Sequence, residues 1–249
     1  MKKQFQILAT TFITIAIVSC SKERIEMQQA EPKSTEEIST SSSSSNERGI
    51  VIDPLTVNLE GSFQFNGDLK DQTRKLADGV SSKRTVLFTK DRKGNFNSAI
   101  KFDSTYGIKL KSIPQQTHTS LSVWIKPTST SQVNSSVVSS YGFGPHIFHA
   151  MNSVGGAVSI SPWGSIGDWA GTINAGWQHV VVTYDGLNIK IYLNNSLKVN
   201  ISKSGSVSGL VDYFVAYRPQ TEFWKGYVDD LRFYSRTLTA TDVQKLYNL

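Results

Sequence analysis

Two tryptophans, Trp163 and Trp169, lie six residues apart in a segment rich in glycine and serine, residues 161–171, which we expect to be a loop. A flat indole ring can pack against the apolar C–H face of a sugar, and a carboxylate can accept hydrogen bonds from its hydroxyl edge. Aromatic and imidazole side chains in the preceding segment can complete such a wall. We therefore predict a ligand-binding site formed by Tyr141, His146, Trp163, Asp168 and Trp169. The alternative is that the tryptophans close one end of a hydrophobic core.

Two adjacent carboxylates, Asp229 and Asp230, form a second group that can do chemistry. Ca²⁺ takes about six to eight oxygen ligands, many of them from carboxylates and backbone carbonyls. Asp71 lies in a loop rich in Asn and Gly and is a further candidate ligand. These residues predict a structural calcium site. The alternative is an ion pair between one of the two adjacent aspartates and an arginine, with three candidates: Arg92, Arg232 and Arg236.

Cys20 is the only cysteine, and it ends an N-terminal segment that has the order of a secretion signal. Two lysines begin this segment, and residues 5–18 are mostly apolar but too short for a membrane-spanning helix. An apolar residue three positions before the cysteine, and a serine directly before it, resemble the bacterial lipoprotein signal. That resemblance implies cleavage before Cys20 and acylation of its thiol. Several acyl chains anchor a protein firmly, because each buried CH₂ contributes about 0.8 kcal/mol; the alternative is an ordinary cleaved signal.

The chain is expected to have three parts: a signal peptide (residues 1–19), a disordered tether that starts with lipidated Cys20 (residues 20–49), and one folded domain (residues 50–249). The tether includes five consecutive serines and few large apolar side chains, so it cannot bury enough surface to offset chain entropy. A lysine and a glutamate soon after Cys20 resemble signals that send lipoproteins to the outer face of the outer membrane. We therefore expect a domain exposed at the cell surface, with a domain that faces the periplasm as the alternative.

The formal charge of +6 lies entirely in residues 50–249, which hold 20 basic and 14 acidic side chains. Residues 70–111 alone hold eleven Lys and Arg against four Asp. Such a field can hold an anionic polysaccharide or lie against acidic lipid headgroups, and a solvated basic face is the alternative. Nucleic acid is not an expected partner, because the chain carries an export signal and shows no helical recognition element. A single cysteine also excludes a disulfide framework.

The elements that must position these residues have the pattern of β-strands. Short alternating or β-branched runs recur about every eight to twelve residues, separated by turn-forming residues, which is typical of a β-sandwich or barrel. In the run 121–125 the alternation predicts that Trp124 points into the core between two sheets. A helix is expected only at the C-terminal end, where Thr239 or Thr241 can cap a segment with apolar residues at helical spacing.

Six motifs occur in the order of one known family. They are FQFNG (63–67), DRKGNFNSAIKFD (91–103), SLSVWIKP (120–127), GWQHVVVTYDG (176–186), KIYLN (190–194) and FWKGYVDDLRFYSRTLT (223–239). Over residues 57–249 the chain resembles the LamG-like, concanavalin A-like jelly rolls of bacterial surface lipoproteins. The resemblance implies an all-β sandwich of two antiparallel sheets and a structural role for His179. The family includes binding proteins, adhesins and some enzymes, so the fold does not settle the function.

The sequence contains no motif of a hydrolase. Concanavalin A-like glucanases carry Glu-x-Asp-x-x-Glu on one strand, and this chain has no such run. Asp168 and Glu222 could supply two carboxylates that flank a glycosidic bond only if the fold brought them together. We therefore predict a non-catalytic cell-surface lipoprotein that captures, or attaches to, a polysaccharide or glycoprotein glycan. The alternatives are a protein-interaction or structural module with an outer-membrane partner and, less favoured, a glycoside hydrolase.

Overall fold

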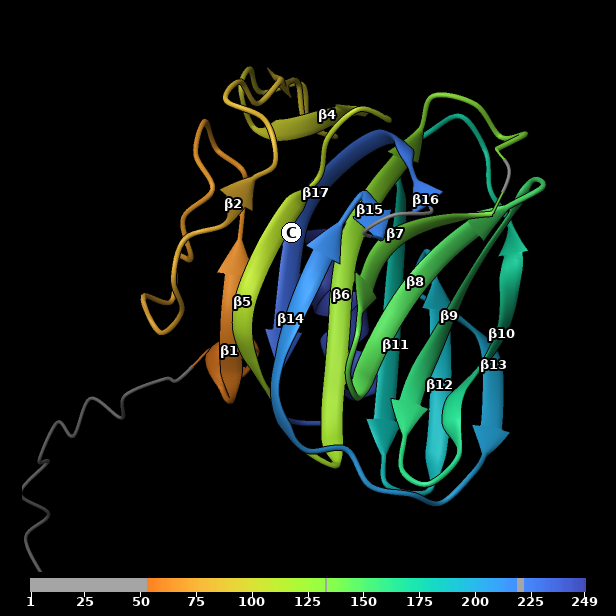
Figure 1. Ribbon diagram of the computed structural model, residues 1–249. Coiled ribbons are helices and arrows are strands. Elements are labelled where there is room, and N and C mark those ends of the chain that lie inside the picture. The colour runs from red at the N-terminus through yellow and green to blue at the C-terminus, as the bar shows by residue number, and fades with distance from the viewer. Residues whose placement is uncertain (1–52, 133, 219–221) are drawn as a thin grey trace, which may run out of the picture. The chain divides into compact units, whose positions relative to one another are not determined.

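The computed structural model describes residues 53–132, 134–218 and 222–249. These residues form two antiparallel β-sheets packed face to face (Figure 1), together with one α-helix, α1 (Ala240–Asn248). The prediction of a two-sheet, all-β sandwich with a short C-terminal helix is thus confirmed. Cys20, the predicted signal peptide (residues 1–19) and the predicted tether (residues 20–49) lie outside the described residues.

The first sheet has eight strands. In spatial order they are β13 (Ser196–Ser202), β12 (Asn188–Leu193), β11 (Gln178–Asp185), β6 (His118–Pro127), β17 (Lys225–Tyr234), β4 (Ala99–Asp103) and β3 (Phe88–Thr89), and β1 (Leu59–Phe63) also pairs with β17. The long strand β17 therefore pairs with β1, the first strand of the described residues, as well as with β4 and β6.

The second sheet has seven strands and lies toward the viewer in Figure 1. In spatial order they are β10 (Gly164–Thr172), β9 (Ser153–Ile160), β8 (Gly144–Ala150), β7 (Ser135–Ser140), β14 (Gly209–Val215), β5 (Ile108–Gln115) and β2 (Val80–Ser81). Two short strands, β15 (Tyr217–Arg218) and β16 (Glu222–Phe223), pair with each other separately. Strands β7 to β10 follow one another as hairpins, which places residues of neighbouring strands opposite each other.

Successive side chains along each strand point to opposite faces of the sheet, so one set faces the core between the sheets and the other set faces away from it. On β11, Val180 and Val182 are buried between the two sheets, whereas Val181 points the opposite way. That opposite face is also covered, because Val181 belongs to a second apolar cluster with Val243 and Leu246 of α1. The eight-stranded sheet is therefore buried on both faces over part of its area.

Trp124 lies on the helix-covered face of the eight-stranded sheet, and the prediction that it points between the sheets was wrong. Its strand neighbours Val123 and Ile125 are the ones buried in the main core. Its indole stacks on His179, with ring centroids 5.0 Å apart, and on Tyr247 of α1 at 5.4 Å. Strand alternation shows which residues share a face, but it does not show whether a distant helix covers the second face.

Helix α1 begins at the capping residue Thr239. The Thr239 hydroxyl accepts a hydrogen bond from the backbone N–H of Asp242, and the Asp242 carboxylate accepts one from the N–H of Thr239, at 3.1 and 3.0 Å. Arg236 also donates to Asp242 at 2.7 Å. This reciprocal capping satisfies backbone donors of the first turn, which explains why Thr239, rather than Thr241, starts the helix.

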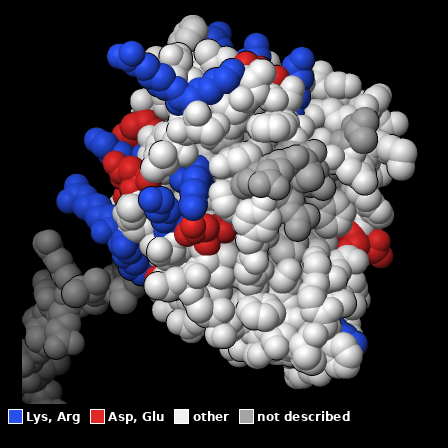
Figure 2. Space-filling view, viewed as in Figure 1, with Lys and Arg blue, Asp and Glu red and all other residues white. Residues whose placement is uncertain are grey.

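Charged side chains are distributed unevenly over the surface. In Figure 2 they gather along the upper and left part of the view, over β2, β4 and β5, while few are visible over β8 and β9 of the seven-stranded sheet. Within the described part of the chain, no helix is long and apolar enough to span a bilayer.

Candidate functional site

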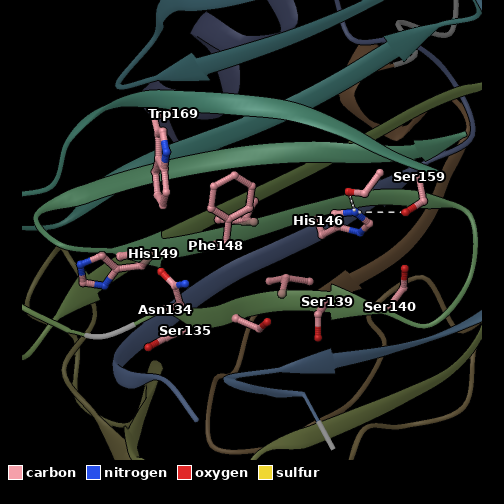
Figure 3. A pocket seen from close by; sticks show the side chains of 14 residues that line it. Asn134, Ser135, Ser139, Ser140, His146, Phe148, His149, Ser159 and Trp169 are labelled. Atoms are coloured by element: carbon pink, nitrogen blue, oxygen red, sulfur yellow. Dashed lines mark hydrogen bonds between the residues drawn. The ribbon is translucent and has the colours of Figure 1, made fainter. Parts of the chain in front are cut away.

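A cavity of about 320 Å³ opens on the outer face of the seven-stranded sheet, across β7 to β10. We call it the sheet cavity, and Figure 3 shows its side chains. Its aromatic and imidazole lining is Phe148, Trp169, His146 and His149, and its polar lining includes Asn134, Ser135, Ser139, Ser159 and Ser165. A cavity of this size matches the lower range of known small-ligand pockets, roughly 300–1,000 Å³.

Strand β9 leaves the space for the cavity. Its core-facing positions are Val154, Val158 and Ile160, which are all buried between the sheets. The intervening positions, which face outward, carry only Gly155, Ala157 and Ser159. Because these side chains are small, the surface of β9 lies lower than the side chains of the strands on either side.

Phe148 and Trp169 form the aromatic wall of the cavity. Both residues lie opposite Gly155, Phe148 from β8 and Trp169 from β10. Because Gly155 has no side chain, the two rings meet in an edge-to-face contact, with centroids 4.8 Å apart and planes at 84°. A Cβ atom at Gly155 would lie 2.6 Å from the Phe148 ring. Trp169 remains 44% exposed, so part of its ring is available to a ligand.

His146 marks the polar end of the cavity. Its Nε2 atom lies 2.9 Å from the Ser165 hydroxyl and 3.3 Å from the Ser159 hydroxyl, the contacts drawn as dashed lines in Figure 3. Ser159 and Ser165 are directly opposite each other on β9 and β10. The imidazole and the hydroxyls can each donate or accept a hydrogen bond, so this end of the cavity can bind ligand hydroxyls that act as donors or as acceptors.

The sheet cavity is uncharged. Among the described residues that line it, none is Asp, Glu, Lys or Arg. Its chemistry is therefore an apolar ring wall beside a floor of hydroxyl, amide and imidazole groups. Such a surface can bind a neutral polyhydroxylated ligand by ring packing and hydrogen bonds.

The structure brings together two of the five predicted ligand-binding residues, because only Trp169 and His146 line the sheet cavity. Trp163 precedes β10, where its Nε1–H donates to the Ser204 carbonyl at 3.0 Å. Lys203 places its ammonium 3.6 Å from the centre of the Trp163 ring. Trp163 is 55% exposed, but it lies outside the cavity.

Asp168 and Tyr141 also lie outside the cavity lining. The Asp168 carboxylate is exposed and accepts a hydrogen bond from the backbone N–H of Trp169 at 2.7 Å. Tyr141 lies between β7 and β8 and packs edge-on against Phe214, with centroids 5.3 Å apart. Most of the segment expected to be a loop is the edge strand β10, so alternation sends Asp168 and Trp169 to opposite faces.

Phe148 and the serine floor were not among the residues predicted from the sequence. The pattern in residues 153–160 contained a usable signal, since small residues alternate with large apolar ones there. A strand with one apolar face and one face of Gly, Ala and Ser indicates an open surface rather than a second core. The neighbours that fill this surface cannot be identified without the pairing of the strands.

His149 is a buried structural residue of the cavity lining. Its Nδ1 accepts a hydrogen bond from the Trp224 indole N–H at 3.1 Å, and its Nε2 lies 3.2 Å from the Thr130 carbonyl. Nε2 must therefore carry the proton and donate to Thr130. Burial lowers the pKa of His149, which keeps the ring neutral.

Arg92 bridges the two adjacent carboxylates, Asp229 and Asp230. Its Nη1 lies 2.7 Å from Asp229 Oδ2, and its Nη2 lies 2.8 Å from Asp230 Oδ2. A break in strand pairing after Asp229, with φ of +45° at Asp230, lets consecutive side chains reach one guanidinium. The same guanidinium lies 4.8 Å above the Trp124 ring. Burial and the adjacent Asp230 raise the pKa of Asp229 to about 7, although Arg92 acts in the opposite direction.

Asp71 organises a loop through backbone contacts. Its carboxylate accepts hydrogen bonds from the N–H groups of Ser62, Thr73, Lys75 and Leu76, at 2.8 to 3.2 Å, and from the Thr73 hydroxyl at 2.5 Å. No group of three potential metal ligands occurs among the described residues. The geometry therefore supports the ion-pair interpretation for Asp229 and Asp230, and the structural calcium site stays a prediction.

His179 is buried on the helix-covered face of the eight-stranded sheet. Its Nε2 lies 2.8 Å from the Ser122 hydroxyl, and its ring stacks on Trp124 at 5.0 Å, with the Tyr247 ring 6.1 Å away. Burial, with the charges of Arg92 and Arg232, lowers the pKa of His179 to about 3. This neutral, enclosed ring has the structural role that the family resemblance implies.

The fold and the cavity define a lectin-like jelly-roll domain. Residues 97–244 match a family model described as the concanavalin A-like lectin/glucanases superfamily. The match covers more than half of the chain, so the chain belongs to this superfamily, as predicted. No curated protein matches the chain significantly in sequence.

Solved structures of low sequence identity share this fold. Domain 4 of a GH43 extracellular arabinanase from Geobacillus stearothermophilus, in complex with arabinotriose, is 20% identical with a TM-score of 0.63, and the match covers 76% of this chain and 98% of that domain. A structure of botulinum neurotoxin type C, described as interacting with two ganglioside molecules, is 16% identical with a TM-score of 0.60. The match covers 77% of this chain and 51% of that chain. The binding domain of Paraclostridial Mosquitocidal Protein 1 is 15% identical with a TM-score of 0.63. The match covers 78% of this chain and 52% of that chain. The chain spans about half the length of these last two.

Proposed function

We propose that this protein is a non-catalytic lipoprotein of the bacterial cell surface, and that its sheet cavity binds a neutral segment of a glycan. The observation that carries the proposal is the Phe148–Trp169 ring pair over Gly155, beside a floor of hydroxyl groups. A pyranose or furanose ring presents an apolar face and a hydroxyl edge. The cavity offers a partner for each of them: the exposed part of Trp169 for the face, and His146 with the serines for the edge.

The relatives in structure support a carbohydrate ligand. One solved neighbour holds arabinotriose and another interacts with gangliosides, and both have the sandwich fold of this chain. At such low sequence identity these structures support only the shared fold, so the kind of sugar is inferred from the residues that line the cavity. The absence of charged side chains from that lining, within the described residues, favours a neutral sugar over an acidic one.

The arrangement of carboxylates favours binding without catalysis. Retaining and inverting glycosidases need two carboxyl groups about 5–9 Å apart across the scissile bond. The described lining of the sheet cavity has no carboxylate, and the adjacent carboxylates Asp229 and Asp230 are bridged by Arg92 on the other sheet. Two acidic side chains are therefore not positioned at the proposed ligand.

The anchoring part of the proposal rests on the sequence. Residues 1–19 have the pattern of a secretion signal, and Cys20 has the context of a lipoprotein cysteine. Acylation at Cys20 would hold the chain at the outer membrane, with residues 20–49 as a tether. A domain on such a tether could meet glycans of the environment or of a host.

A glycan array probed with the purified full chain tests this function. We expect binding to a small set of neutral oligosaccharides, with arabinotriose as the first probe, and no shortening of the bound glycans by chromatography. Hydrolysis products would contradict the non-catalytic assignment. Binding to no glycan, together with co-purification of an outer-membrane protein, would contradict the glycan-binding assignment and favour the protein-interaction alternative.

A further inference from the structure

A row of lysines and aromatic rings crosses four strands of the eight-stranded sheet. Lys101 on β4 lies opposite Tyr227 on β17, and Tyr227 lies opposite Lys126 on β6. Gln178, the first residue of β11, lies opposite the residue before Lys126, so Trp177 comes next to Lys126. The order across the sheet is therefore lysine, tyrosine, lysine, tryptophan.

All four side chains belong to the face that points away from the core. Their strand neighbours Ile100, Ile125 and Val228 are buried between the two sheets. Alternation therefore directs Lys101, Lys126 and Tyr227 to the opposite face. This face belongs to the other sheet of the sandwich, so the row is separate from the sheet cavity.

A second cavity, of about 390 Å³, lies at this row. We call it the lysine cavity. Its walls include Trp177, Tyr227, Lys126 and Lys90, and the turn that contains Gly94 closes one side. The Trp177 and Tyr227 rings are 6.3 Å apart and inclined at 59°, so they form a corner rather than a stack. Trp177 is half-buried, which leaves part of its ring facing the cavity.

The lysines of this cavity and of the adjoining row carry charge that no described ion pair neutralises. Among the ion pairs of the described residues, none includes Lys90, Lys101 or Lys126. The Lys126 ammonium lies 5.3 Å from the centre of the Tyr227 ring, and the Lys90 ammonium lies 4.3 Å from that of Phe96. These contacts orient the ammonium groups but leave their charge available to an anion.

The acidic residue of the cavity is already engaged. The Asp91 carboxylate accepts hydrogen bonds at 2.8 Å from the N–H groups of Lys93 and Asn95 and from the Asn95 side chain. It holds the turn in which Gly94 adopts a φ of +88°, a conformation that glycine adopts without strain. Arg92, the remaining cation, is paired with Asp229 and Asp230. Asp91 keeps its negative charge, so the lining presents two lysines outside the described ion pairs, Lys90 and Lys126, against one carboxylate.

We propose that the lysine cavity is a second carbohydrate site, which binds an acidic sugar residue such as a uronate or a sialate. The ligand carboxylate would contact the ammonium groups of Lys126 and Lys90, and the apolar face of its ring would pack on Trp177. An isolated anion would use the lysines but not the Trp177 wall, whereas a neutral sugar would use the wall but not the charge. A sugar acid uses both within one residue.

Titration calorimetry with the purified full chain tests this proposal. The acidic probes are tetragalacturonate, a hyaluronan tetrasaccharide and sialyllactose, and the neutral probes are galactotetraose and lactose. We expect at least one acidic probe to bind at least tenfold more tightly than its neutral counterpart. Affinity should fall when salt is raised from 0.05 to 0.5 M, because the ammonium groups are solvent-accessible.

Matched variants locate the site. Lys126→Gln and Trp177→Ala should each weaken binding of the acidic probe about tenfold, the loss typical of one charge-assisted hydrogen bond or one sugar–ring contact. Lys126→Arg should retain most of the affinity. Lys198→Ala, an exposed lysine on β13, and Trp169→Ala, in the sheet cavity, should leave the affinity unchanged, which separates this site from the proposed neutral one.

Three outcomes would overturn the proposal. The first is equal affinity for acidic and neutral probes, and the second is failure of every acidic sugar to bind the folded wild-type chain. The third is binding of glycerol 3-phosphate or dihexanoyl phosphatidylglycerol, sensitive to Lys126→Gln, with no binding of acidic sugars. That last result would identify a phosphate or lipid-headgroup site instead. Circular dichroism of each variant confirms that it is folded.

Discussion

Trp169 meets Phe148 edge-on, with 4.8 Å between the ring centroids, across the bare backbone of the strand that lies between them. The two residues are 21 positions apart in the sequence and come from strands that do not pair with each other. Their contact exists because the intervening residue is glycine. One absent side chain thus creates both the ring pair and the depression beside it, which makes the pair the most testable feature of the sheet cavity.

Replacing Trp169 with alanine should weaken glycan binding about tenfold, because the ligand loses its ring contact. The fold should persist, since β10 is an edge strand and Trp169 is 44% exposed. Titration against the best glycan of the array measures the effect. Trp163→Ala is the matched control, because Trp163 is an exposed tryptophan outside the cavity. Equal losses in the two variants would contradict the placement of the ligand.

Gly155→Ala should also weaken glycan binding, because the new Cβ would lie 2.6 Å from the Phe148 ring and displace it. It would also lie 2.6 Å from the Asp168 carbonyl, so we expect a lower melting temperature as well. The double variant with Trp169→Ala should bind about as weakly as Trp169→Ala alone, since both changes remove the same wall. Fully additive losses of binding free energy would indicate that the two residues act separately.

Arg92→Ala should lower the free energy of unfolding by about 3 kcal/mol, because it removes the partner of the almost fully buried Asp229 and leaves Asp230 only its 3.8 Å contact with Arg232. Urea unfolding measures the loss. Adding Asp229→Asn should restore part of it, since the amide carries no charge. Lys93→Ala, an exposed neighbour, should change stability by less than about 0.5 kcal/mol. A stable Arg92→Ala protein would show that the bridge is dispensable.

His179 should make the domain sensitive to acid. Its pKa is about 3 in the folded protein, below the ordinary value of 6.5, so the unfolded chain takes up a proton more readily. Stability that is complete above pH 6.5 is therefore lost as the pH falls toward 3, by at most about 1.4 kcal/mol per pH unit. His179→Gln should reduce this slope in urea unfolding between pH 7 and 4.5. An unchanged slope would mean that other groups dominate acid unfolding.

Cys20→Ser should abolish incorporation of labelled palmitate and release the protein from the membrane fraction of the producing bacterium. The reason is that the thiol is the acylation site in the proposed anchor. Protease treatment of intact cells then tests exposure of wild-type protein at the surface. Palmitate label that persists in the Cys20→Ser variant would exclude lipidation at this cysteine, and a protected domain would indicate a periplasmic orientation.

Chelation of calcium should leave the melting temperature unchanged. Asp71 already accepts hydrogen bonds from four backbone N–H groups, and Arg92 occupies Asp229 and Asp230. Scanning calorimetry in calcium and in a chelator compares the two states. A melting temperature several degrees higher in calcium would restore the calcium site suggested by the sequence, since a ligand of the folded state raises its stability.

The sheets and the helix could be predicted because their signals are local or follow family order. Strand alternation, turn residues and the capping pattern at Thr239 each involve residues close together in the chain. The carboxylate pair at Asp229 and Asp230 also suggested an arginine partner, although the sequence left three candidates. Arg92 is the close partner of both carboxylates, because a break in the pairing of β17 turns them toward the β3–β4 turn, and Arg232 also lies 3.8 Å from Asp230.

The composition of the candidate sites followed from sequence only in part. Trp169 and His146 were predicted as ligand-binding residues from their side-chain types. Phe148 and the serine floor lie beside them only because of the register in which β8, β9 and β10 pair. The same limit explains Trp124, whose position depended on whether α1 returns to cover the second face of its sheet. By itself the sequence determined which residues alternate, which turns close and what charge the chain carries. Only the tertiary structure decided which faces become core or cavity, because strand pairing brings together residues that no local pattern relates.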